Sequence, residues 1–197
     1  MRDSQTNIIE SQLRECFGRV VFTHKTHEKQ ADILEAQRSC LSITQIVLAA
    51  LGTGGFVATL FGKGALGAAV GSIVSLLLLV LNAYTKDHDL GALAERHKQA
   101  ASELWLVREQ YFSLLTDLRL GSLSLDEVAT KRDELMHHLQ EVQQGAPTTT
   151  PKAYMRAQKA LKHQEDLTFS DAEINAFLPG PLKRSTGHNA TQGEDDV

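Results

Sequence analysis

The chain has 197 residues and a formal net charge of −4 at pH 7. Because it carries no basic excess, nucleic acid is not expected as a direct partner. Four prolines and an aromatic content of 6% are typical of a helical protein. Mean hydropathy is slightly negative, at −0.19, so any membrane-inserted part is expected to carry a polar, cytoplasmic body.

Residues 1–40 predict an amphipathic cytoplasmic helix. They are polar overall, which disfavours a secretory signal peptide, and no proline interrupts them. One face of this helix is defined by alternating three- and four-residue steps. Its residues are Ile9, Leu13, Cys16, Val20, Thr23, His27, Gln30 and Leu34.

Residues 41–85 predict a two-helix transmembrane hairpin. Two charge-free apolar runs, 41–62 and 64–84, are separated by Lys63 alone. Each holds about 20 residues, and a helix of that length spans ~30 Å, the thickness of a bilayer's hydrocarbon core. A single long helix would place Lys63 in lipid at a cost of about 2.5–3.5 kcal/mol, whereas Gly62-Lys63-Gly64 favours a tight turn. A buried hairpin of a soluble protein is disfavoured, because soluble helices seldom run this far without a charge.

Basic residues predict the orientation of the hairpin. The turn has Lys63 alone, while the two outer ends have several cations, so the positive-inside rule places both termini in the cytoplasm. We therefore expect a multi-pass protein of the cell inner membrane, with Cys16 and Cys40 as free thiols. The outer cations are Lys25, Lys29, Arg38, Lys86, Arg96 and Lys98.

Residues 86–145 predict a cytoplasmic helical hairpin whose first helix pairs with the 1–40 helix. The two arms are of similar length, so they are expected to pack antiparallel as a stalk that continues the membrane helices. A heptad pattern marks the seam of the second arm. Its residues are Leu90, Leu93, His97, Ala100, Leu104, Val107, Tyr111, Leu114 and Leu118.

Two capping boxes organise the C-terminal part of the chain. Ser124 and Glu127 predict the start of one helix, and Ser170 and Glu173 the start of a shorter one. We expect a linker and helices over 146–181, followed by a disordered tail over 182–197. The predicted fold is all-α throughout.

Small residues recur every four positions in both membrane runs, which lets helix backbones approach closely. They serve either packing within the hairpin or packing between subunits of a homo-oligomer. The first stripe is Ala50, Gly54 and Ala58, and the second is Gly67, Gly71 and Ser75.

A mildly polar arc follows the second membrane run through Ser72, Ser75 and Asn82. In an oligomer such an arc can line a water-filled lumen. The alternative is that the hydroxyls bond back to their own helix. Because neither run contains a charged residue, an ion-coupled transporter is disfavoured.

Functional side chains are densest over 17–29. Arg19, His24, Lys25 and Lys29 predict a site for an anionic ligand such as a phosphate; the alternative is a solvated helix face with polar contacts between helices. His24 and His27 are one turn apart but have no evident third ligand, so no metal site is predicted. No catalytic arrangement or phosphate loop stands out, so neither enzyme activity nor a cofactor is expected.

Two strings, LRECFGRVVFTHKTHEKQADIL (13–34) and LKHQEDLTFSDAEINAFLP (161–179), flank the membrane hairpin and the long helix after it. Together with this architecture they resemble the SLATT proteins, the two-transmembrane effectors that accompany SMODS-type nucleotidyltransferases or SLOG-type sensors in bacterial conflict systems. The resemblance covers about residues 9–179. It carries no catalytic residues.

The resemblance implies a pore-forming or membrane-disrupting effector of an anti-phage, abortive-infection system opened by a nucleotide signal. The implied partners are the lipid bilayer, other copies of the chain, and a cyclic nucleotide second messenger or a sensor protein encoded nearby. One alternative is a non-catalytic membrane scaffold that tethers a partner through its coiled stalk. A holin-like lysis protein is a third reading, although holins are usually shorter.

Overall fold

The computed structural model describes residues 2–60, 64–164 and 166–183. These residues form helices and no strand, which confirms the all-α prediction. The chain divides into two compact units, Met1–Ala157 and Gln158–Val197; the finer five-segment division stays a prediction. The elements are α1 (Arg2–Leu60), α2 (Gly64–Asp87), α3 (Leu90–Leu120), α4 (Leu125–Gly145), α5 (Pro151–His163), α6 (Asp171–Phe177) and a 3₁₀ turn (Gly180–Leu182).

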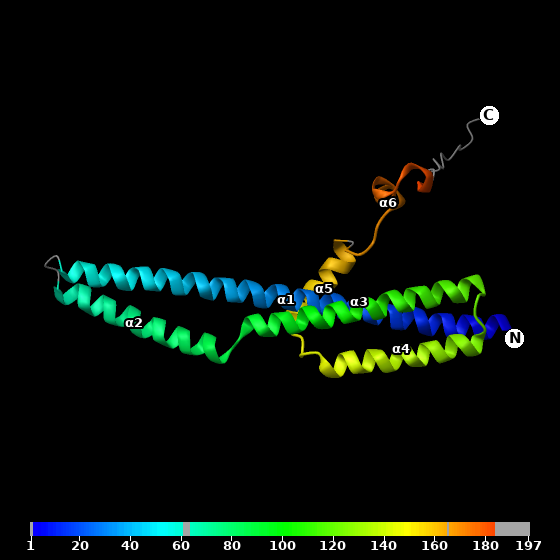
Figure 1. Ribbon diagram of the computed structural model, residues 1–197, viewed down its shortest axis with the longest axis horizontal. Helices are drawn as coiled ribbons and strands as arrows, with labels where there is room; N and C mark the ends of the chain where they lie inside the picture. The colour runs from blue at the N-terminus through cyan, green and yellow to red at the C-terminus, as the bar shows by residue number, and fades with distance from the viewer. Residues whose placement is uncertain (1, 61–63, 165, 184–197) are drawn as a thin grey trace, which may run out of the picture. The chain divides into compact units, whose positions relative to one another are not determined.

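The first unit is built on the long helix α1, which packs against α2 over one half and α3 over the other (Figure 1). The seam between α1 and α3 forms the stalk core, as the heptad pattern predicts. Fully buried apolar residues of this seam fall on the predicted positions. They are Leu13 and Val20 of α1 and Leu104, Val107 and Tyr111 of α3.

Helix α4 returns along α3 and completes a three-helix core with Val128 and Val142. The reversal before it needs Gly121, whose φ of 66° is in the left-handed region that glycine adopts without strain. The predicted capping box then starts α4, with Ser124 accepting from the Glu127 N–H and the Glu127 carboxylate accepting from the Ser124 N–H. The second predicted capping box starts α6 in the same way.

The two arms differ in how they join the membrane hairpin to the stalk. Helix α1 runs from one to the other without interruption, as predicted. On the second arm the helix breaks after Asp87, and α3 begins anew at Leu90, where the Asp89 carboxylate accepts from the Ala92 N–H at 2.9 Å. The helix therefore continues from hairpin to stalk on the first arm, whereas the second arm has a joint at His88 and Asp89.

Glycine contacts set the spacing of α1 and α2 in the hairpin. A Cβ atom on Gly67 would lie 2.9 Å from the Gly55 carbonyl oxygen and 3.0 Å from Thr59 Cγ2, and one on Gly55 would lie 3.3 Å from the Gly67 carbonyl oxygen. The backbones approach so closely that no side chain fits at Gly67 without movement. The predicted turn at 62–64 falls on residues 62 and 63, outside the described residues; Gly64 begins α2.

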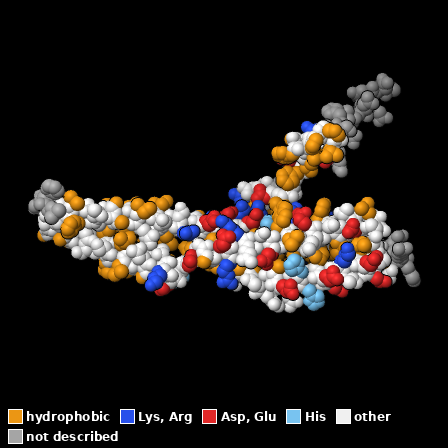
Figure 2. All heavy atoms as spheres, in the orientation of Figure 1, with side chains coloured by type: hydrophobic (Ala, Val, Ile, Leu, Met, Phe, Trp, Pro, Cys, Tyr) orange, Lys and Arg blue, Asp and Glu red, His pale blue; other side chains and the backbone are white. Residues whose placement is uncertain are grey.

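The surface of the hairpin is apolar. Two helical stretches long and apolar enough to cross a bilayer lie within Ser4–Val57 and Gly64–Leu120, and their most apolar segments are only 0% and 6% buried. No core therefore covers them. Figure 2 shows charged side chains gathered over the stalk, while the hairpin carries mainly uncharged ones. This distribution is that of a chain inserted in lipid. Residues 184–197, within the predicted disordered tail, lie outside the described residues.

Candidate functional site

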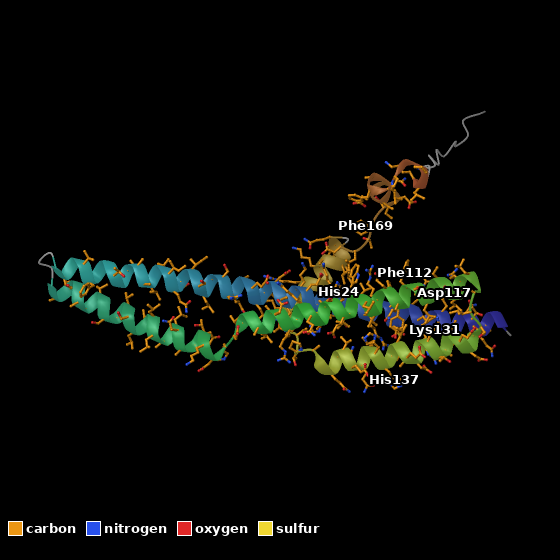
Figure 3. The ribbon with its side chains drawn as sticks, in the orientation of Figure 1. His24, Phe112, Asp117, Lys131, His137 and Phe169 are labelled. Atoms are coloured by element: carbon orange, nitrogen blue, oxygen red, sulfur yellow. The ribbon has the colours of Figure 1, made fainter. Side chains whose placement is uncertain are left out.

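A layer of buried polar side chains interrupts the apolar seam of the stalk. Helix α1 is covered on more than one side here, because α3 packs on one side and the start of α5 on another, with the Phe22 and Tyr154 rings 4.9 Å apart. Figure 3 labels His24 at this level. The layer consists of His24, Lys25, Thr26, His27, Gln30 and His97, each at most 8% exposed.

Two histidines meet at the centre of the layer. The Nδ1 atoms of His27 and His97 are 2.9 Å apart, so one neutral ring donates its N–H to the lone pair of the other. Burial lowers the pKa of His27 to about 4, with further lowering by His97 and His24. Burial also lowers the pKa of His97, as does nearby Arg96. Both rings are therefore neutral near pH 7, and protonation of both would remove the acceptor and break their hydrogen bond.

Gln30 connects this layer to the start of α5. Its Oε1 accepts from the Thr150 N–H at 3.0 Å and from the Thr150 hydroxyl at 2.6 Å. The Thr150 hydroxyl oxygen in turn lies 3.3 Å from the Ala153 N–H, which it caps. A buried amide on α1 thus fixes where α5 begins, so a change in the α1–α3 seam also reaches α5.

An open cleft of about 530 Å³ lies beside the histidine layer, between α1 and α3. His24 forms part of its wall, and its Nδ1–H donates to the Ala101 carbonyl oxygen at 2.9 Å. The Trp105 ring lies 5.3 Å from that of His24, and the Arg108 guanidinium carbon lies 4.3 Å from the Trp105 ring centre. The cleft is lined by His24, Lys25, Glu28, Lys29, Ala31, Asp32, Lys98, Ala101, Ser102 and Trp105.

The cations of this cleft are matched by carboxylates. Lys25 Nζ lies 2.9 Å from Glu28 Oε2, and Lys29 Nζ lies 3.4 Å from Asp32 Oδ2. Lys98 pairs with Glu35, which raises the pKa of Lys98. The carboxylates are exposed on the open side of the cleft, whereas Lys25 itself is buried. The cleft therefore contains lysines that are each paired with an acidic side chain, and the anion site stays a prediction.

Three of the four residues predicted for the anionic site line this cleft. They are His24, Lys25 and Lys29. Arg19 does not line it: it lies on the exposed side of α1 and pairs with Glu15, which raises the pKa of Arg19.

Lys98 and Trp105, both on α3, were missed because the sequence analysis did not align the two arms. Equal distance from Gly62 pairs His27 with His97, but it does not give the contacts of Lys98 with Glu35 or of Trp105 with His24.

The small-residue stripes of the hairpin are placed on two different surfaces. Gly67 and Gly71 face α1, where they contact Gly55. Ala50 is exposed, and a Cβ atom on Gly54 would meet nothing within 4 Å, so the first stripe faces away from α2. The side chain of Ala58 lies outside the described residues.

The polar arc of α2 is divided in the same way. The Ser72 hydroxyl donates to the Ala68 carbonyl oxygen at 2.8 Å, within its own helix, and Ser75 is exposed. Asn82 instead faces α1, where its Oδ1 accepts from Gln45 Nε2 at 3.0 Å. Gln45 also donates to the Thr85 hydroxyl at 3.2 Å, which ties α1 to α2 at the stalk end of the hairpin.

The chain matches the model of the SMODS and SLOG-associating 2TM effector domain family 4 over residues 9–173. This range includes the stalk, the hairpin, the cleft and the start of α6. Neither the curated proteins nor the solved structures contain a match to the chain.

Proposed function

We propose that the chain, which belongs to the SMODS and SLOG-associating 2TM effector domain family, is the pore-forming or membrane-disrupting effector of a bacterial anti-phage system. The family and the two apolar helices make it a membrane-associated effector. The proposal adds that it acts without catalysis, that it lies in the inner membrane with both termini in the cytoplasm, and that a nucleotide signal opens it.

The observation that supports a pore is that the small residues of the hairpin lie on two different surfaces. Close packing of α1 on α2 uses Gly55 and Gly67, while Ala50 and Gly54 remain on the outer surface. Small residues on a lipid-facing surface let a further helix approach closely. Copies of the hairpin packed through this surface can form a ring, and the exposed Ser75 then supplies a polar group to its lumen.

The cleft between α1 and α3 is the proposed receiver of the signal. Phosphates of a cyclic nucleotide would take the places of Glu28 and Asp32 beside Lys25, Lys29 and Lys98. Since the cleft borders the histidine layer, such an exchange acts where α1, α3 and α5 meet. A ligand opens the assembly only if it binds the open form better than the closed form.

Replacement of Lys29 and Lys98 together by glutamine should therefore abolish signal-dependent loss of membrane potential in bacteria that express the chain. A voltage-sensitive dye measures the potential while a cyclic nucleotide synthase is induced. Arg19→Gln is the matched control, since Arg19 is an exposed cation of α1 outside the cleft, and it should keep the response. A double variant that depolarises cells as the unchanged chain does would refute the cleft as receiver, and a sensor protein would then be needed.

A further inference from the structure

A second polar cleft, of about 200 Å³, lies where the hairpin joins the stalk. It is placed at the end of the apolar spans, at the joint between α2 and α3, and therefore at the depth of lipid headgroups. Helix α1 supplies one wall and the α2–α3 joint the other. The lining residues are Arg38, Leu41, Ser42, Gln45, Thr85, His88, Asp89, Leu90 and Gly91.

Arg38 is the cation of this cleft, and it differs from the cations of the stalk. Its guanidinium lies against the backbone of α3, where a Cβ atom on Gly91 would be 3.0 Å from Nη1 and 3.1 Å from Cζ. Lys25, Lys29 and Lys98 each pair with a carboxylate. Among the residues that the structure describes, Arg38 has no ion pair and no hydrogen bond.

The other charge in the cleft is already engaged. The Asp89 carboxylate accepts from the Ala92 N–H and caps α3, so the backbone N–H groups at this helix end are not what attracts a ligand. The planar guanidinium of Arg38 lies close to the α3 backbone at Gly91 and has its donors unused. Such a fork matches the two oxygens of a phosphate.

The remaining lining residues fit the boundary between lipid and water. Ser42 offers an exposed hydroxyl, while Leu41 and Leu90 are half-buried apolar side chains. The Tyr84 ring stacks on His88 with centroids 4.6 Å apart, beside the cleft, and tyrosine is enriched at membrane interfaces. A ligand with a phosphate and acyl chains therefore meets a polar group, Ser42, for the phosphate and apolar side chains, Leu41 and Leu90, for the acyl chains.

We infer that this cleft binds the phosphate of a phospholipid headgroup, held by Arg38 with the Ser42 hydroxyl as a further donor. A lipid source is favoured over a soluble phosphate because the cleft borders the apolar spans. A bound headgroup would bridge α1 and the α2–α3 joint, so it would stabilise one arrangement of hairpin and stalk.

The test is thermal unfolding of the full chain in a non-ionic detergent, followed by circular dichroism. Phosphatidylglycerol should raise the Tm by about 2–4 °C more than a diacylglycerol with the same acyl chains, which lacks the phosphate. Glycerol phosphate, the soluble headgroup, should give no rise. If diacylglycerol gives the same rise, or if glycerol phosphate reproduces it, the lipid headgroup site is overturned.

Three variants assign the effect to the cleft. Arg38→Gln should lose the phosphatidylglycerol-specific shift, and Lys86→Gln should keep it, because Lys86 is an exposed cation at the same end that does not line the cleft. Gly91→Ala should reduce the shift by displacing the guanidinium, while alanine favours the helix itself. An unchanged Tm shift in both Arg38→Gln and Gly91→Ala would overturn the proposal. If Arg38→Gln fails to fold, the Tm shift of Gly91→Ala alone tests it.

Discussion

Gly67→Leu should separate α1 from α2 and abolish membrane permeabilisation. The new Cβ atom would lie 2.9 Å from the Gly55 carbonyl oxygen and 3.3 Å from the Thr59 nitrogen. These are backbone atoms of the facing helix, so the contact is relieved only by moving the helices apart. Overpacking of this kind costs about 1–3 kcal/mol or more. Thermal unfolding in detergent should show the loss of stability, and dye release from liposomes the loss of function.

Gly54→Leu is the matched control, because it places the same side chain in the same hairpin where a Cβ atom meets nothing within 4 Å. Because it leaves the packing of α1 on α2 unchanged, it should unfold at the same temperature as the unchanged chain when both are compared as monomers. If subunits pack through the outer stripe, it should nevertheless lose the oligomer and dye release. Full stability and full release in Gly67→Leu would contradict the close approach of α1 and α2, and full release in Gly54→Leu would contradict the role of the outer stripe.

Acidification from pH 6.5 to about 4.5 should destabilise the stalk. The pKa of His27 is lowered to about 4 in the folded chain from a usual value of 6.5. Between these values the unfolded chain binds the proton and the folded chain does not, so stability rises with pH and is lost as pH falls below 6.5. The expected loss is about 2 kcal/mol, because most of the difference between the two pKa values is titrated within this pH range.

His27→Gln should flatten this pH dependence, measured as Tm against pH in detergent, because glutamine binds no proton. His137→Gln is the control, since His137 is an exposed residue of α4, and it should keep the slope. Carboxylates with lowered pKa values, such as Glu10, lose their contribution below their usual value of about 4.5, so the window above it isolates histidine. An unchanged slope in His27→Gln would mean that the buried pair does not control the stability of the seam.

The sequence predicted the helices and the seam because both follow from periodicity. Leu104, Val107 and Tyr111 are buried at the heptad positions that identified them, and Ser124 begins a helix through its capping box. The joint at Asp89 was missed. An aspartate caps a helix well, but the segment has no proline, and a single glycine such as Gly91 is tolerated within a helix, so the same residues also suit a continuous helix.

The candidate site was predictable in part. Spacing on one helix placed His24 and Lys25 near each other, and both lie at the cleft. The partners on α3 depend on the register between the two arms. Apolar periodicity alone does not determine this register, because a shift by whole helical turns keeps the same face buried. The predicted turn near Gly62 would have paired His27 with His97, but it would not have paired Glu35 with Lys98. The burial of the polar side chains could not be predicted for another reason. It depends on α5, which covers α1 through the contact of Gln30 with Thr150, and these residues are far apart in the sequence.

The most direct test of the central claim is dye release from liposomes that contain the purified full chain, with and without cyclic nucleotides. We expect release that depends on the chain, increases with the activating nucleotide, and is lost in Gly54→Leu. Intact oligomers that release no dye under any of these conditions would contradict a pore and favour a membrane scaffold held together by the stalk.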